Sequence, residues 1–215
     1  MINTQTEKGG VSVGYVVVIL LAYLLGSSNM ALYISKLKNM DIRTGGSGNL
    51  GASNATALLG WSAGILVALH DIGKAVLAVL LAKHLFPELT YIGAVAGVAC
   101  VLGHIFPFYL KFRGGKGFAS YVGMVLALKW KFALIIVALI IVVILITDYM
   151  VAGTTLTILA VPVYFGIAEH SLILALILCI ATAVIIYKHR MNYVRIYNGT
   201  EMSLRGGMKG KYRVE

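Results

Sequence analysis

Charged residues are scarce in this sequence. Only 12% of the 215 residues are Asp, Glu, Lys or Arg, whereas 60% are hydrophobic, and the mean hydropathy is +0.90. A soluble domain cannot bury that much apolar surface, so we predict an integral membrane protein. Acidic residues are the scarcest charged class, with 8 against 18 Lys and Arg, which leaves a net charge of +10.

Cysteine is also nearly absent, and the features of several other protein classes are missing. Cys100 and Cys179 each lie in an apolar run without a neighbouring ligand, so neither a disulfide framework nor a metal site is expected. The cations lie between long apolar runs rather than along a face with interleaved aromatic residues, which argues against a nucleic-acid partner. Cofactor motifs are absent, and we expect no cofactor.

Long apolar runs predict an all-α polytopic membrane bundle. A spanning helix needs about 20 apolar residues. We interpret the first run as an uncleaved helix rather than a signal peptide, because only Lys8 precedes it. A single domain over residues 1–215 and a monomeric state are expected. The seven predicted spans are 11–34, 56–82, 91–109, 117–128, 132–146, 153–167 and 172–187.

The cations between these spans predict the orientation of the chain. Cytoplasmic loops carry an excess of Lys and Arg. This rule places the N-terminus outside and the C-terminus in the cytoplasm of a cell membrane, with three polar segments facing the cytoplasm. The 13 cations then inside are Lys36, Lys38, Arg43, Lys111, Arg113, Lys116, Lys188, Arg190, Arg195, Arg205, Lys209, Lys211 and Arg213.

The first polar segment, residues 41–54, is rich in glycine. Around Ser47, Gly48 and Asn49 the chain can turn successive N–H groups toward one anion, and a helix expected near Thr56 adds its positive end. These features favour a phosphate cradle with Arg43 beside it, and a flexible connector is the alternative. The segment lacks the Lys-Ser/Thr ending of a nucleotide P-loop, so ATP binding is not indicated.

The second polar segment contains two motifs. A Gly114-Gly115-Lys116-Gly turn lets an ammonium and backbone donors converge on phosphate, with Arg113 as a second cation. Anchoring to lipid head groups is the alternative for this turn. His104 lies upstream, and helix capping or packing remains as open as catalysis for that residue.

The third polar segment, residues 189–201, follows the last span. His189, Asn192 and Arg195 recur at i, i+3 and i+6, which brings the first two to one face of a continuing helix. Such a face suits a small phosphorylated polyol. A juxtamembrane basic helix on anionic lipid is the alternative.

Ionisable residues also occur inside the second predicted span. Asp71 and Lys74 are one helical turn apart and can form an ion pair. Pairing is expected because an isolated charge within a membrane span costs free energy. A structural clamp and a direct catalytic role both remain open for them.

Together these residues resemble those of the seven-span bacterial glycerol-3-phosphate acyltransferases that use acyl phosphate (PlsY). The resemblance covers nearly the whole chain. It includes Gly26-Ser27, 45–54, Asp71 with Lys74, Gly103-His104 with Pro107, 114–117 and 189–201. It implies active-site roles for Ser47, Asn49, Gly51, Ser53, Asn54, His104, Lys116, Thr154, His189, Asn192, Arg195 and Glu201.

The chain departs from that family's pattern at a few positions. Ser53 replaces a threonine and keeps the hydroxyl. Ala57 stands where the family usually has an arginine that contacts phosphate, Asp148 replaces an arginine and Asn29 a proline. Losing a charged contact of this kind costs about 1.5 to 3 kcal/mol, so a paralogue with a different acceptor is an alternative.

The predicted chemistry needs no strong protein nucleophile, because an acyl phosphate carries a good leaving group. No His-x-x-x-x-Asp spacing follows any histidine, so a histidine-carboxylate base is not indicated. The resemblance suggests that the donor's own phosphate accepts the proton. A transporter of a phosphorylated metabolite would show internal repeats, which we do not find, and a lipid-binding subunit would leave the three motifs unexplained.

Overall fold

The structure, a computed structural model, describes residues 4–201, 203 and 205. Within them every regular element is helical, as predicted. Lys209, Lys211 and Arg213, which entered the orientation argument, lie outside the described residues. The elements are α1 (Thr4–Ser27), α2 (Met30–Leu37), α3 (Ala52–Leu59), α4 (Trp61–Leu85), α5 (Ile92–Ile105), the 3₁₀ turn η1 (Phe108–Leu110), α6 (Phe118–Leu128), α7 (Trp130–Thr147), α8 (Met150–Ala168) and α9 (Leu172–Tyr197).

Six helical segments of the described residues are long and apolar enough to cross a membrane. The remaining predicted span, 117–128, corresponds to α6, which has only 11 residues. At 1.5 Å per residue it extends over about 16 Å, roughly half the hydrocarbon thickness. The six segments are Val13–Leu37, Trp61–Leu85, Ile92–Leu110, Trp130–Thr147, Met150–Ala168 and Leu172–Tyr197.

Two of the predicted spans are interrupted. The helix expected over 11–34 ends at Ser27, and Asn29 caps α2 by accepting the Leu32 N–H at 2.9 Å. The helix expected over 56–82 is divided at Gly60, whose φ of 94° is tolerated by glycine and breaks the helical path. The preceding piece, α3, begins at Ala52 rather than near Thr56, so this boundary of the prediction is wrong.

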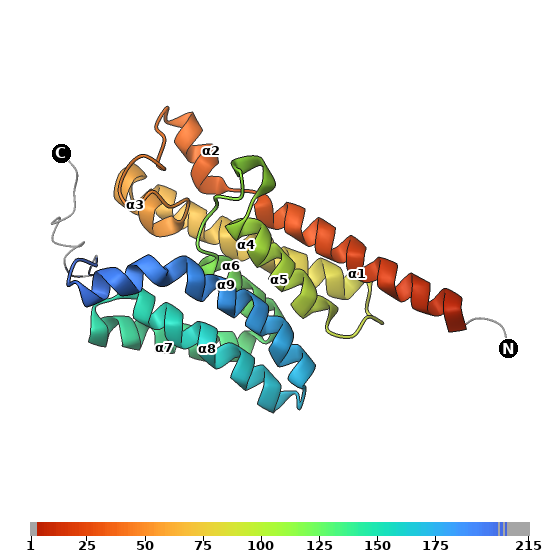
Figure 1. The fold of residues 1–215 in the computed structure, drawn as a ribbon. Helices are drawn as coiled ribbons and strands as arrows, with labels where there is room; N and C mark the ends of the chain where they lie inside the picture. Colours follow the sequence, from red (N-terminus) through yellow and green to blue (C-terminus); the bar gives the residue numbers. More distant parts are fainter. Residues whose placement is uncertain (1–3, 202, 204, 206–215) are drawn as a thin grey trace.

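The helices pack around α5, which is buried over most of its length (Figure 1). Glycines permit its close approach to α1, because a Cβ on Gly26 would lie 2.1 Å from the Cys100 carbonyl oxygen. A Cβ on Gly103 would likewise lie 2.2 Å from the Tyr23 carbonyl oxygen. The outer helices leave apolar side chains exposed, as a lipid-facing surface requires.

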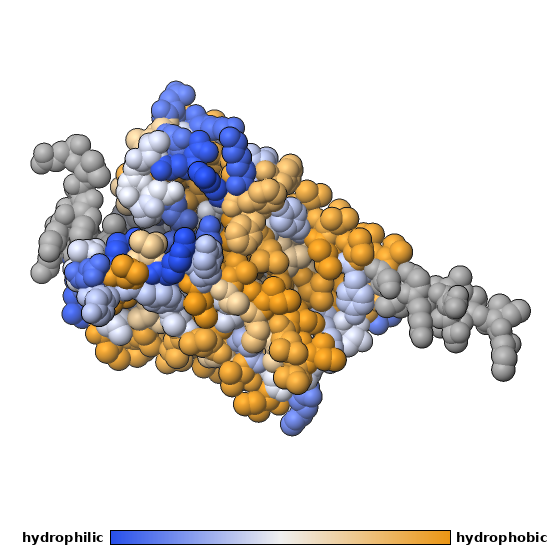
Figure 2. Space-filling view, viewed as in Figure 1, coloured by the Kyte–Doolittle hydropathy of each residue, from blue (hydrophilic) through white to orange (hydrophobic). Residues whose placement is uncertain are grey.

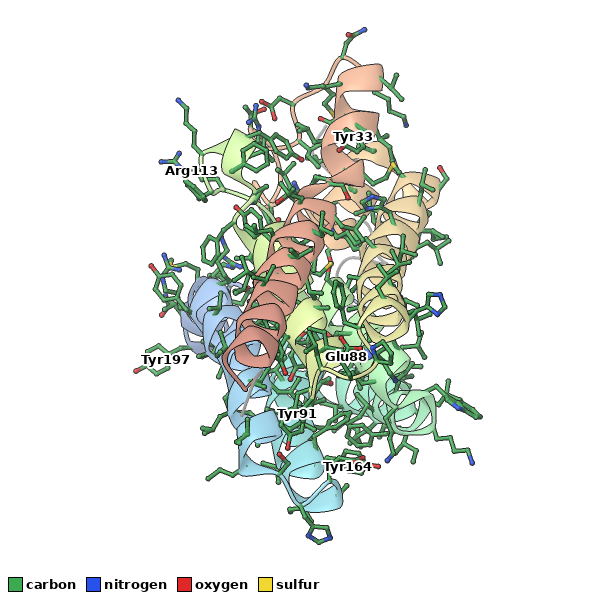
Figure 3. All side chains as sticks on the ribbon, turned by 90° about the vertical axis from the view of Figure 1, so that its right-hand side faces the viewer. Tyr33, Glu88, Tyr91, Arg113, Tyr164 and Tyr197 are labelled. Carbon is green, nitrogen blue, oxygen red and sulfur yellow. The ribbon has the colours of Figure 1, made fainter. Side chains whose placement is uncertain are left out.

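The two ends of the bundle differ in polarity. In Figure 2 hydrophilic residues gather around α2, α3 and the C-terminal end of α9, whereas most of the lateral surface is hydrophobic. Figure 3 shows Tyr33 and Arg113 at the α2 end and Glu88 and Tyr91 toward the other end. At that other end Lys129 pairs with Glu169 at 2.8 Å. The three polar segments of the sequence therefore meet at one end.

Candidate active site

Asn54 gives the first polar segment its shape. Its Oδ1 accepts the Ser47 N–H at 2.9 Å, and its Nδ2 donates to the carbonyls of Ile42 at 2.8 Å and Gly45 at 3.4 Å. The side chain is 3% exposed, whereas Ser47 and Gly48 are exposed. Asn54 thus folds the loop back on α3 and presents Ser47 at the surface.

The two glycines of the second segment pack directly on the end of α5. The Gly114 and Gly115 N–H groups donate to the carbonyls of Ile105 at 3.1 Å and His104 at 3.2 Å. A Cβ on Gly115 would lie 2.0 Å from the His104 Nε2, so no larger residue fits. This contact directs Lys116, the next residue, toward α9.

Lys116 joins the second segment to the third. Its Nζ donates to the Asn192 Oδ1 at 2.6 Å, and the Asn192 Nδ2 donates to the Glu201 Oε1 at 2.6 Å. The Arg195 Nε donates to the Glu201 Oε2 at 2.6 Å. We call Lys116, Asn192, Arg195 and Glu201 the loop cluster. His189, one turn before Asn192 on α9, is buried, and its Nδ1 lies 2.9 Å from the Ile185 carbonyl oxygen.

The three segments enclose an outer cavity of about 790 Å³. Its lining contains a single acidic residue, Asp41, and that carboxylate binds the Arg43 guanidinium at 2.7 Å. The cavity therefore suits a small polyanion. The seven cations of its lining are Arg43, Lys111, Arg113, Lys116, Lys188, Arg190 and Arg195.

An inner cavity of about 550 Å³ lies beside it, between α3, α4, α6, α8 and α9. Its walls are largely apolar, with Ile72, Phe118, Val122 and Val151 among them. The polar groups of this cavity include His104, Thr154 and His189. The two cavities share five lining residues, which are Ser47, Asn49, Lys116, Asn192 and Arg195.

The predicted site residues converge on these cavities with one exception. Gly115 lines neither cavity and instead packs against the His104 ring. Lys111, Lys188 and Arg190, which were predicted only as cations that set the topology, also line the outer cavity. Lys188 and Arg190 flank His189 in the sequence, and this position beside a predicted site residue could have indicated a role in the site. The remaining predicted residues that line a cavity are Arg43, Ser47, Gly48, Asn49, Gly51, Ser53, Asn54, His104, Arg113, Gly114, Lys116, Thr154, His189, Asn192, Arg195 and Glu201.

Lys116 and Asp41 are among the groups at the site, outside the spans, whose pKa values are shifted. Burial lowers the pKa of the Lys116 ammonium below its usual 10.5, and the nearby Arg195 lowers it further. Hydrogen bonds from Arg43 lower the pKa of the Asp41 carboxyl to about 2. Arg43 is therefore partly neutralised, whereas Lys116 lies in a crowded field of positive charge that an anion would relieve.

A second polar cluster lies within the spanning helices. The Asp71 Oδ1 is 2.8 Å from the Lys74 Nζ and 3.3 Å from the His104 Nδ1, and all three side chains are at most 3% exposed. We call Asp71, Lys74 and His104 the helix-embedded cluster. The predicted Asp71–Lys74 pair is confirmed. The contact between His104 and Asp71 joins α5 to α4, so no His-x-x-x-x-Asp spacing in the sequence corresponds to it.

The positions that depart from the family pattern have local partners. Ala57 lines the inner cavity, and because its side chain is short, the space that an arginine would fill at this position is part of the cavity. Asp148 occupies the turn between α7 and α8 at φ 66°, and its Oδ1 accepts the Arg205 N–H at 2.9 Å. Asn29 serves as the N-cap of α2 and also donates to the Leu50 carbonyl at 3.4 Å.

The fold and the site define a class of protein. A cation-rich cavity at one end of a bundle of apolar helices adjoins an apolar chamber, and the two share a wall. This arrangement is typical of a membrane protein that acts on an anion bearing a lipid chain. The comparison with known proteins specifies the class further.

The chain belongs to the glycerol-3-phosphate acyltransferase family, whose model matches residues 16–199. It is 40% identical over 191 residues to a glycerol-3-phosphate acyltransferase of Coxiella burnetii, covering 87% of this chain and 96% of that protein. A glycerol-3-phosphate acyltransferase of Clostridioides difficile is 38% identical over 197 residues, covering 88% and 95%.

A solved structure has the same fold. The crystal structure of PlsY (YgiH), an integral membrane glycerol 3-phosphate acyltransferase, in its glycerol 3-phosphate form, is similar with a TM-score of 0.84 and 31% identity. The match covers 92% of this chain and 98% of that one. The lysophosphatidic acid form of PlsY matches with a TM-score of 0.80 and 32% identity. These matches support an integral membrane architecture for this chain.

Proposed function

We propose that this protein moves a fatty acyl group from acyl phosphate to the sn-1 hydroxyl of glycerol 3-phosphate. Family membership makes it an acyltransferase of glycerol 3-phosphate. The observation that carries the detailed assignment is the shared wall of the two cavities. Lys116 belongs to both, so one ammonium can contact a phosphate in each.

Glycerol 3-phosphate occupies the outer cavity in this proposal. Its phosphate meets Lys188 and Arg190, whose partners in the described residues are aromatic rings and a carbonyl rather than carboxylates, and Asn192 and Arg195 orient the polyol. The His189 Nδ1–H donates to the Ile185 carbonyl, which leaves the Nε2 lone pair free to accept a hydrogen bond from a substrate hydroxyl.

Acyl phosphate occupies the inner cavity, with its chain among Ile72, Phe118, Val122 and Val151. Its phosphate lies near Lys116, Ser47 and the Thr154 hydroxyl. The acceptor hydroxyl attacks the acyl carbon, the bond from that carbon to the phosphate oxygen breaks, and the leaving phosphate takes the hydroxyl proton. The products are lysophosphatidic acid and inorganic phosphate. Positioning and neutralisation of charge supply the rate enhancement.

The same proposal fixes the membrane topology. The polar end of the bundle carries the site and most of the described loop cations, whereas the other end carries Lys129 and Lys131. Under the positive-inside rule the site faces the cytoplasm, with the N-terminus outside a cell membrane. Seven crossings satisfy this orientation, and the 11-residue α6 is then a short fourth crossing. We propose that residues 1–215 act as one domain and as a monomer.

The test uses purified protein, acyl phosphate and radiolabelled glycerol 3-phosphate, with labelled glycerol as the matched acceptor that lacks a phosphate. We expect labelled lysophosphatidic acid and one inorganic phosphate per acyl group transferred, and no acylated glycerol. Release of phosphate without labelled product from glycerol 3-phosphate would instead indicate a different acceptor, for which the space beside Ala57 leaves room.

A further inference from the structure

The ammonium of Lys74 is surrounded by three acceptors. Its Nζ lies 2.8 Å from the Ser28 carbonyl oxygen, 2.8 Å from the Asp71 Oδ1 and 2.9 Å from the His104 Nδ1. A lysine ammonium has three protons and no lone pair. Each of the three contacts therefore uses one proton of the ammonium.

This arrangement determines which nitrogen of His104 carries hydrogen. Because Lys74 can only donate, the His104 Nδ1 must accept, and its lone pair is occupied. A hydrogen bond to the Asp71 oxygen, 3.3 Å from the same nitrogen, would require an Nδ1–H, and a nitrogen that accepts from Lys74 at 2.9 Å carries no hydrogen. The neutral ring then carries its proton on Nε2.

The Nε2–H group has a defined place to donate. His104 lines the inner cavity, and because Gly115 has no side chain, the space beside the Nε2 that a Cβ would fill stays free. Among the described residues no protein acceptor contacts this nitrogen. The apolar walls of that cavity suit an acyl chain, and the Lys116 ammonium is part of the same lining. A hydrogen-bond donor at this position would face the phosphate end of the acyl phosphate.

We propose that Lys74 is a positioning residue that fixes His104 as a hydrogen-bond donor to an anionic oxygen of the acyl phosphate. This inference rests on the proposed function. His104 then does not act as a base, and it differs from His189, whose Nδ1 donates to a carbonyl and whose Nε2 accepts. The two histidines face one cavity with opposite hydrogen-bonding roles.

Lys74→Met tests this role because it keeps the length of the side chain and removes the donor. The His104 Nδ1–H tautomer becomes favoured, since Asp71 is then its only partner, and Nε2 presents a lone pair to an anion. We expect a loss of about tenfold to hundredfold in kcat/KM for acyl phosphate. The KM for glycerol 3-phosphate should stay unchanged.

The double variant Lys74→Met with Asp71→Asn is the matched control. The new amide can donate to the His104 Nδ1, which restores the Nε2–H tautomer, and no uncompensated buried charge remains. We expect it to recover most of the activity lost in the single variant. Because this substitution also removes the unpaired buried charge, kcat/KM is compared at a matched folded concentration, where a purely structural clamp would show no difference between the two variants. Melting temperature and size-exclusion profile establish that both variants fold.

The tautomer itself is measured by ¹⁵N NMR of the histidine-labelled protein, with the His104 signal assigned by its loss in His104→Gln. We expect an unprotonated Nδ1 in the wild type and a protonated Nδ1 in Lys74→Met. An Nδ1–H in the wild type, an unchanged tautomer in the single variant, or an exchanged tautomer with full activity would overturn the proposal. Since this readout needs no substrate, it is independent of a failure of the acyl-transfer assay.

Discussion

The helix-embedded cluster and the loop cluster use the same kinds of side chain in different surroundings. In each, one carboxylate binds a cation, and the assembly orients a group that faces a cavity. Lys74 and Asp71 have exposed side-chain fractions of 2% and 3%, whereas Arg195 has 38% and Glu201 10%. Water and ions therefore screen the loop cluster and leave the helix-embedded cluster unscreened.

This difference separates stability from substrate binding. A buried ion pair that loses one partner leaves an uncompensated charge, so the loss of one charged member of the helix-embedded cluster should lower the free energy of unfolding of the bundle. The loop cluster can exchange its carboxylate for a substrate phosphate at lower cost, because its groups are partly solvated. The same chemical pairing thus supports the fold in one place and is available for binding in the other.

The largest effect is expected from Asp71→Ala. The substitution leaves the Lys74 ammonium buried without its counter-ion, which should destabilise the protein by about 3 to 5 kcal/mol. The melting temperature in detergent measures this, with Lys131→Ala at the exposed opposite end as the control. A melting temperature equal to that of the wild type would show that the two clusters do not differ in the way described.

Lys116→Ala should remove activity rather than stability. We expect transfer to fall at least about a hundredfold, since the variant loses a cation that faces both phosphates. The measurement is initial-rate formation of labelled lysophosphatidic acid at a matched folded concentration. Lys131→Ala should keep the wild-type rate. Full activity in Lys116→Ala would contradict the proposal that the residues shared by the two cavities contribute to catalysis.

Glu201→Gln probes how the loop cluster is oriented. The amide keeps the shape but replaces a charge-assisted contact to Arg195, now at 2.6 Å, by a weaker one. We expect a rise of about tenfold in KM for glycerol 3-phosphate and little change in melting temperature. A large loss of stability would instead place Glu201 with the helix-embedded cluster.

The pH profile should reveal the crowding around Lys116. Its pKa is lowered below 10.5 by burial and by Arg195, so the charged form is lost as the pH rises through that lowered value. We expect kcat/KM to fall by up to tenfold per pH unit on this alkaline limb, after subtraction of uncatalysed donor hydrolysis. In Lys116→Arg the remaining activity should lose this limb, because a guanidinium stays charged. A limb unchanged in that variant would point to another group.

Sequence patterns anticipated the loop cluster better than the helix boundaries. Lys116, Asn192 and Glu201 stood in polar segments whose composition already suggested phosphate chemistry, and the structure brings them within hydrogen-bonding distance. The break at Gly60 was missed because hydropathy averages over a window and does not register one residue with positive φ.

The helix-embedded cluster could be predicted only in part. Asp71 and Lys74 are one turn apart on α4, so their pairing follows from helical periodicity. The partners from elsewhere, His104 and the Ser28 carbonyl, depend on how α1, α4 and α5 pack together. Gly115 was expected to offer its backbone N–H to phosphate, whereas that N–H donates to the His104 carbonyl and the residue packs against the His104 ring. Contacts of this kind are set by tertiary packing and leave no spacing signal.

The most direct test of the central claim is the change in melting temperature produced by glycerol 3-phosphate. A ligand that binds only the folded protein stabilises it by RT ln(1 + [L]/Kd), so this temperature keeps rising with the logarithm of the ligand concentration above Kd. We predict a concentration-dependent rise for the wild type and for Lys131→Ala, none with glycerol, and a rise strongly reduced in Lys116→Ala. An equal rise in Lys116→Ala and the wild type would contradict the claim that the three polar segments bind phosphate together around this lysine.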